Sequence, residues 1–206
     1  NGVEQNVSYI ALDSRASGRA QTLATYTAGA DFPVQKTDLG ESRKVTRVSG
    51  ADRYATAVAI SRSSFNSSDT VFLARGDDFA DALSAGPLAA ELEAPILLVK
   101  GGSIDTLTAA EIERLGATKV IPVGGYGAVP ERVKGLPAGV MLDNANRLRG
   151  EDRYETSVAV VRQLQKETGN PKLPLIAVTG RDFPDAVSAG PAASSVGGAV
   201  VLVPSS

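Results

Sequence analysis

The chain has 206 residues, of which 43% are hydrophobic and 21% charged, and its formal net charge is −2. This length allows one large domain or two of ordinary size, and the charge gives no basic surface of the kind that binds nucleic acid. Cysteine and histidine are both absent, which excludes thiolate nucleophiles, imidazole bases and ordinary zinc sites. No apolar run approaches the roughly 18 residues of a membrane span, and the first residues lack the basic and apolar parts of a signal peptide.

The pattern of apolar runs predicts a parallel α/β fold. Residues 1–44 suggest a strand over 7–12 and a helix around 18–26. Beyond them, short runs rich in Val, Ile and Leu at 71–74, 95–99 and 119–123 are typical of strands covered on both faces. Further short strands are expected at 45–48 and 139–142. Helical patterns fill the intervals, so we expect parallel sheets with helices on both faces.

Several residues predict where helices begin and end. Asp52 and Asp152 stand where N-caps of two helices are expected. Residues 108–111 (TAAE) read as a capping box, with a helix over 109–115 that Gly116 ends. The Gly-Pro pairs at 86–87 and 190–191 should break or kink the helices that contain them.

The sequence contains a tandem repeat. Residues 47–60 (RVSGADRYATAVAI) recur at 147–160 (RLRGEDRYETSVAV), and residues 76–90 (GDDFADALSAGPLAA) recur at 180–194 (GRDFPDAVSAGPAAS). The repeats predict an N-terminal segment over 1–44, a complete first unit over 45–143, and a second unit over 144–206 that lacks the last third of the pattern. Such duplication favours a module that gains strength by multiplication over a single asymmetric active site.

The repeated motifs allow binding and structural interpretations. Arg53 and Arg153 at helix N-termini could hold a phosphate or carboxylate, or they could pair with neighbouring acids while the aspartates cap and the tyrosines pack. The acid pair at 78 and 81, repeated at 182 and 185, could suggest a metal or glycosidase site. Capping and an ion pair between repeats explain it better. The loop at 123–130 (VGGYGAVP) fits either ligand contact or a tight turn.

Taken as a set, these motifs resemble the cell wall binding repeat, type 2, of Gram-positive surface proteins. The set is R-[VL]-x-G-x-D-R-Y-x-T, then G-x-D-F-x-D-A-[LV]-S-A-G-P, then APILLV, then VGGxGAV, and it covers 45–142 and 147–203. The resemblance implies Rossmann-like units, usually three around a pseudo-threefold axis. It also implies a secreted, non-enzymatic module that holds its protein on the cell wall by binding anionic polysaccharide or teichoic-acid-like polymers, without a cofactor or metal.

The resemblance and the repeated arginines together give a set of candidate polymer-binding residues. The family's Ile-Leu-Leu run falls on 96–98, with a looser match at 200–202. The candidates are Arg47, Arg53, Tyr54, Arg75, Ile96, Leu97, Leu98, Arg147, Arg153, Tyr154 and Arg181. Two other functions remain open: self-association of the repeats in a surface layer, and a wall glycan hydrolase that uses the paired acids.

Overall fold

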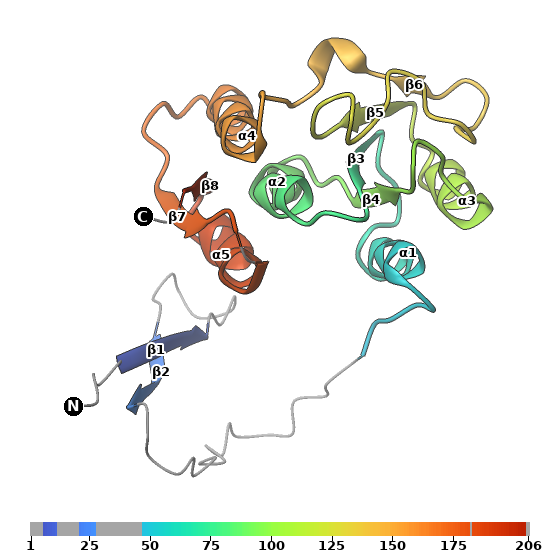
Figure 1. Ribbon diagram of the computed structural model, residues 1–206. Coiled ribbons are helices and arrows are strands. Elements are labelled where there is room, and N and C mark those ends of the chain that lie inside the picture. Colours follow the sequence, from blue (N-terminus) through green and yellow to red (C-terminus); the bar gives the residue numbers. More distant parts are fainter. Residues whose placement is uncertain (1–5, 12–20, 28–46, 182, 205–206) are drawn as a thin grey trace. The chain divides into compact units, whose positions relative to one another are not determined.

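The computed structural model describes residues 6–11, 21–27, 47–181 and 183–204 (Figure 1). The chain divides into two compact units, residues 1–47 and residues 48–206. In the first unit, β1 (Asn6–Ala11) pairs antiparallel with β2 (Gln21–Thr27). The strand expected over 7–12 is therefore confirmed up to residue 11. The helix expected around 18–26 is wrong over 21–26, because the three threonines and one tyrosine of QTLATYT favour a strand; residues 18–20 lie outside the described part.

The second unit contains a four-stranded parallel sheet. Its strands are β3 (Thr70–Arg75), β4 (Ile96–Val99), β5 (Lys119–Pro122) and β6 (Met141–Leu142), in the order β4-β3-β5-β6. Phe72 lies beside both Ile96 and Ile121 in the register. All four expected strands beyond residue 70 are confirmed. Residues 45 and 46 of the strand expected at 45–48 lie outside the described part, and residues 47 and 48 belong to no strand.

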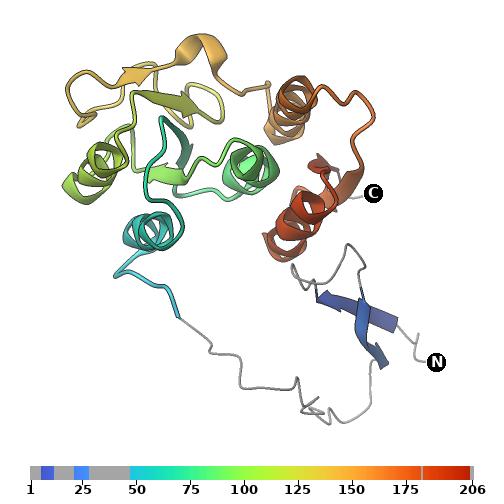
Figure 2. The ribbon, with the colours of Figure 1, turned by 180° about the vertical axis from the view of Figure 1, so that it is seen from behind.

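Helices cover both faces of this sheet, as the apolar runs predicted. On one face, Val71 and Leu73 pack with α1 (Arg53–Ser64) and α3 (Thr106–Leu115), which lie side by side in Figure 2. On the other face, Phe72 and Ala74 pack with α2 (Ala80–Glu91). Side chains of successive strand residues point to opposite faces, so a continuous apolar run fills two cores at once.

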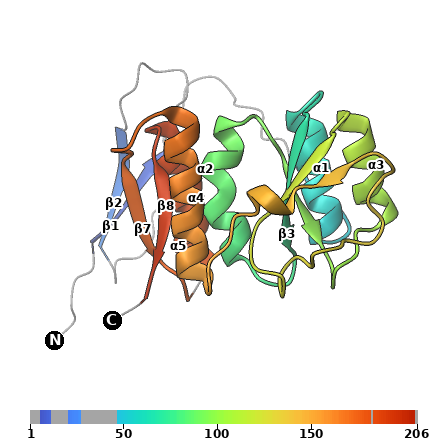
Figure 3. The ribbon, with the colours of Figure 1, turned by 90° about the horizontal axis from the view of Figure 1, so that it is seen from above.

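A two-stranded parallel sheet follows the four-stranded sheet along the chain. A short 3₁₀ turn, η1 (Asn144–Asn146), leads to α4 (Arg153–Thr168), β7 (Leu175–Thr179), α5 (Phe183–Ser195) and β8 (Ala199–Val203). Val160 and Leu164 of α4 join the core under α2, whereas Val200 and Leu202 pack with the alanines of α5. Figures 1 and 3 place α2 between the first sheet and the β7–β8 pair. The core under α2 therefore contains residues of both repeats.

The start of α3 differs from the expected capping box. The N-cap is Asp105, whose carboxylate accepts from the Thr108 backbone N–H at 2.7 Å, and Thr108 is buried inside the helix. The acid of the expected box, Glu111, is instead fully buried and bonded to Ser61 and two arginines. An aspartate three residues ahead of the threonine supplied a competing cap. The expected left-handed stop at Gly116 is confirmed, with φ of 70°.

The Gly-Pro pairs do not break their helices. Both α2 and α5 continue through Pro87 and Pro191. A helical proline loses one hydrogen bond and crowds the preceding turn, but Pro87 is buried beside Leu88, Ala85 and Ala89 in the interior. Packing of an apolar helix face supplies most helix stability in folded proteins, which explains why the expected break is absent.

Candidate polymer-binding site

The G-x-D-R-Y-x-T motif builds the same turn in both repeats. Asp52 Oδ1 accepts from the Ala55 backbone N–H at 2.8 Å, which confirms it as the N-cap of α1. The backbone N–H of Gly50 donates to Thr56 Oγ1 at 3.0 Å. The second repeat reproduces both contacts: Asp152 caps α4 at 2.9 Å, and the N–H of Gly150 donates to Thr156 Oγ1 at 3.1 Å.

The arginine and tyrosine of the motif hold the loop that follows the next strand. Arg53 Nη1 donates to the carbonyl of Gly76 at 2.5 Å, and Arg153 Nη1 donates to that of Gly180 at 2.8 Å. The ring of Tyr54 lies so close to Gly76 that a Cβ atom there would stand 2.4 Å from it, and Tyr154 lies at 2.6 Å in the same relation to Gly180. Each motif therefore places a guanidinium at the carboxyl end of a parallel strand, where ligands of open α/β sheets bind.

Arg153 also joins the two repeats. Its Nη2 donates to Asp78 Oδ2 at 3.0 Å, and its guanidinium lies 5.7 Å from the centre of the Phe79 ring. We call this contact of Arg153 with Asp78 and Phe79 the seam. The first repeat differs here, since Arg53 forms no ion pair within the residues that the structure describes. Among the described residues, the exposed Arg53 therefore makes no counterpart of the bond that Arg153 Nη2 makes to Asp78.

The acid pair at 78 and 81 has structural contacts of its own. Asp78 Oδ1 accepts from the Ala80 backbone N–H at 3.3 Å while Oδ2 binds Arg153. Asp81 lies against Gly124, whose φ of 102° is left-handed and whose missing Cβ would stand 2.3 Å from Asp81 Oδ2. Burial, and next the charge of Asp78, raise the pKa of Asp81. In the second repeat, Asp182 and the side chain of Asp185 lie outside the described part.

Two more candidate arginines lie at the carboxyl ends of strands, Arg75 as the last residue of β3 and Arg181 in the loop after β7. Arg75 binds Asp77 through Nε and Nη2, both at 2.7 Å. The hydrogen bond from Arg75 lowers the pKa of Asp77 to about 2. Arg181 is exposed, and its guanidinium makes no hydrogen bond or ion pair to the described residues. Arg47 is exposed as well, but belongs to the first unit.

The remaining candidates lie inside the fold. Leu97 is fully buried, and Ile96 and Leu98 are half-buried against the core under α2. Arg147 is only 9% exposed, and its Nη1 donates to the carbonyls of Gly124 at 3.0 Å and Val129 at 2.7 Å. Burial lowers the pKa of Arg147. These contacts give the Ile-Leu-Leu run and Arg147 structural roles, and polymer binding by the whole candidate set stays a prediction.

One exposed pair was missed from the sequence. Arg149 lies 5.1 Å from the ring centre of Tyr126, which Arg147 contacts from 4.4 Å. This pair turns the loop at 123–130 into an aromatic surface flanked by a cation. The signal was the extra arginine of RLRG in the second repeat, where the first has RVSG.

The described residues hold no cluster of three or more acids that could bind a metal. None of their helices is long and apolar enough to cross a membrane.

Comparison with known proteins identifies the family. The sequence profile named Cell wall binding domain 2 (CWB2) matches residues 47–134 and 147–206. The chain belongs to this family. It is a cell wall binding module of the kind found on bacterial surface proteins, and its two matched segments correspond to the two repeats.

Relatives of known sequence and structure agree with this assignment. The chain is 33% identical over 124 residues to N-acetylmuramoyl-L-alanine amidase LytC of Bacillus subtilis (strain 168), covering 58% of this chain and 24% of that one. It is 30% identical over 164 residues to the Amidase enhancer of the same organism, covering 79% and 22%. Two solved structures from Clostridium difficile share the fold. Cwp6 has a TM-score of 0.66 at 26% identity over 95% of this chain and 28% of Cwp6. Cwp8 has a TM-score of 0.63 at 28% identity over 76% of this chain and 27% of Cwp8. The chain thus spans about a quarter of each of these proteins.

Proposed function

We propose that this chain is a non-catalytic anchor that binds anionic secondary polymers of the wall and holds a secreted protein on the bacterial surface. The observation that carries the proposal is the repeated arginine turn of a cell wall binding fold. Each repeat places a guanidinium beside a helix N-terminus and the loop after a parallel strand. Helix N-termini favour anions, and guanidinium forks bind phosphate and carboxylate in a fixed geometry.

Weak contacts at several positions suit a long polymer. Arg53 and Arg181 are exposed, and neither guanidinium pairs with an acid among the described residues. A single exposed ion pair contributes only about 0–1 kcal/mol. Two or more sites on one chain strengthen each other, because the first contact raises the effective concentration of the polymer at the second. The net charge of −2 does not oppose this if the binding arginines act locally.

The double substitution Arg53→Ala with Arg181→Ala tests this assignment. Binding to purified wall sacculi should weaken about ten-fold, since each arginine contributes up to about 1 kcal/mol. Wild-type binding should also weaken as salt rises from about 0.1 M to about 0.5 M. Arg162→Ala, an exposed arginine in the middle of α4, is the control. Equal binding by the double variant and the control would reject the arginine assignment.

One set of exposed side chains favours self-association as a second candidate function. Val187 on α5 is 51% exposed and lines a groove between α2 and α5 together with Gly86 and Gly190. Val196, just after α5, is 56% exposed. Light scattering without wall polymer tests this alternative, because a surface-layer module should then form large particles. We do not extend the proposal to glycan hydrolysis, because the carboxylate of Asp78 is already bound to Arg153.

A further inference from the structure

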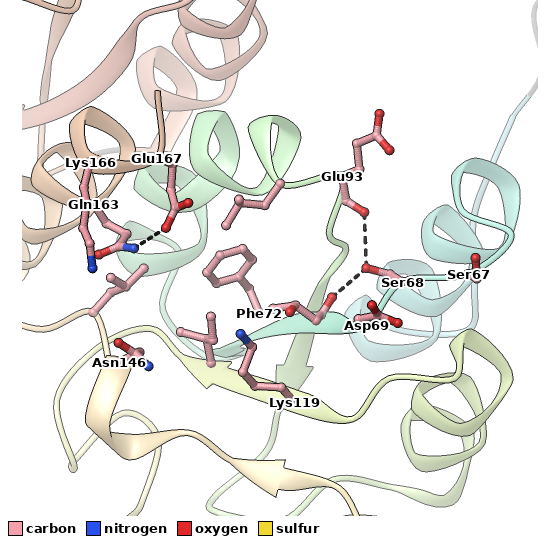
Figure 4. A pocket seen from close by; sticks show the side chains of 14 residues that line it. Ser67, Ser68, Asp69, Phe72, Glu93, Lys119, Asn146, Gln163, Lys166 and Glu167 are labelled. Carbon is pink, nitrogen blue, oxygen red and sulfur yellow. Dashed lines mark hydrogen bonds between the residues drawn. The ribbon is translucent and has the colours of Figure 1, made fainter. Parts of the chain in front are cut away.

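A cavity of about 500 Å³ opens at the amino ends of β3 and β5, at the opposite edge of the first sheet from Arg75 (Figure 4). Its walls are α4, the turn after α2, the residues just before β3 and the connection around η1. The volume lies within the roughly 300–1,000 Å³ of small-molecule sites. None of the candidate polymer-binding residues lines it.

Both repeats build this cavity. Lys119 comes from β5 of the first repeat, whereas Gln163 and Lys166 come from α4 of the second. The inner face of α4 is fixed to the first sheet, because Val160 and Leu164 belong to the same core as Phe72. The walls are therefore held in place by packing, and the cavity exists only where two repeats are joined.

The cavity is lined by positively charged lysines, negatively charged acids and neutral amides, so that it offers both hydrogen-bond donors and acceptors. Figure 4 shows Lys119 and Lys166 reaching in from different walls, with Asn146 and Gln163 between them and Glu93 across the opening. Neither lysine forms an ion pair with any described residue. Phe72 lies at the base. Asp69 and Glu167 also line the cavity, so its acids outnumber its lysines, which disfavours a polyanion. Mixed donors and acceptors over an apolar base suit a ligand rich in hydroxyl groups.

The backbone of Glu93 gives independent support. Apart from glycines, Glu93 alone among the described residues has a left-handed φ, 47°. The equivalent position in the second repeat is Gly197, with φ of 62°. A side chain in this conformation costs roughly 1–2 kcal/mol that glycine avoids. Ser68 Oγ donates to the carbonyl of Glu93 at 3.2 Å and helps to hold the turn. Such strain is kept where the residue has a use. Glu93 lines the rim of the cavity, and its carboxylate points outward from the rim in Figure 4.

We propose that this cavity binds an uncharged pyranoside unit of the wall glycan. The inference rests on the proposed wall-binding function and adds to it a second kind of contact. The arginines at the carboxyl ends of the strands meet the anionic groups of the polymer. The cavity at the amino ends takes a neutral sugar ring, through the amides, the lysines and Glu93. Recognition of the sugar gives specificity that charge alone does not supply.

The test uses the full 206-residue chain and glycan fragments released from purified wall by mild acid, separated by anion exchange into neutral and anionic fractions. Saturation-transfer NMR measures which fraction binds and how tightly. Neutral fragments should bind the wild type. Glu93→Gly and Lys119→Gln should each weaken this binding about five-fold, the effect of losing one hydrogen bond of about 1 kcal/mol. Lys134→Gln, an exposed lysine outside the cavity, is the control.

Glu93→Gly separates binding from folding. The substitution removes the left-handed side chain, so its melting temperature should equal or exceed that of the wild type while sugar binding falls. Equal binding by wild type and both cavity variants, or binding of the anionic fraction alone, would overturn the inference.

Sedimentation of the wild type with intact walls, run in parallel, keeps the two proposals apart. Wild type that sediments with walls but binds no neutral fragment refutes the cavity site and leaves the anchor standing. Wild type that does not sediment refutes the anchor itself.

Discussion

The seam supplies the sharpest stability prediction, because the two repeats offer a matched pair of arginines. Arg153→Ala removes the bond to the Gly180 carbonyl and the ion pair with Asp78, whereas Arg53→Ala removes only the bond to the Gly76 carbonyl. A hydrogen bond from a charged donor contributes about 1.5–3 kcal/mol when buried. Arg153 and Asp78 are 34% and 29% exposed at the side chain, so the ion pair adds only about 0.5–1 kcal/mol.

The expected loss of unfolding free energy is therefore about 2–3 kcal/mol for Arg153→Ala and about 1–2 kcal/mol for Arg53→Ala. Asp78→Asn should lose about 0.5–1 kcal/mol, and a double-mutant cycle between 153 and 78 should return a coupling of that size. Urea denaturation followed by circular dichroism measures all four variants, since the chain has no tryptophan. Equal losses for the two arginines, with zero coupling, would refute the seam as a link between the repeats.

Three further predictions concern the interior and the helix ends. Glu111→Ala should cost about 1–3 kcal/mol in urea denaturation, because it leaves the buried Ser61 hydroxyl without its acceptor. The side chains of Arg62 and Arg114 are 47% and 35% exposed, so water solvates the charges that lose their acid and their loss adds little. Burial opposes the charge of Glu111, but hydrogen bonds from Arg114, Ser61 and Arg62 outweigh it and lower its pKa. The wild type should therefore lose stability as pH falls below the ordinary glutamate range, and the variant should show a flatter profile. Asp81 has a raised pKa, so its contribution declines as pH rises above the ordinary aspartate range, and Asp81→Asn should raise the melting temperature more at about pH 7 than at about pH 4. Asp105→Ala should lose about 1 kcal/mol of unfolding free energy by the same denaturation assay; no loss would contradict Asp105 as the cap of α3.

Much of the fold could be predicted because periodicity and repetition report it directly. Runs such as 71–74 showed that each strand is covered on both faces, and Asp52 with Asp152 marked the two equivalent helices. The errors came where tertiary contacts decide. Thr108 and Glu111 matched a local capping pattern, but Glu111 serves a partner about fifty residues away in sequence, Ser61. The helix through Pro87 likewise continues because its neighbours bury it.

The candidate site was less accessible to sequence reasoning for a physical reason. The repeat located the arginines at equivalent helix starts, and the structure shows that alignment. The repeat could not reveal that Arg147 is buried among carbonyls, because the burial of Arg147 depends on how the loop at 124–130 folds over this side chain. The repeat also could not reveal the cavity, because its lining residues come from segments up to about one hundred positions apart.

The account is tested most directly by sedimentation with purified Gram-positive wall sacculi, before and after chemical removal of secondary wall polymers. We predict that the chain sediments with intact walls and stays in solution with stripped walls. Equal sedimentation with both would show that the ligand is not a secondary polymer, and no sedimentation with either would contradict anchoring by this chain.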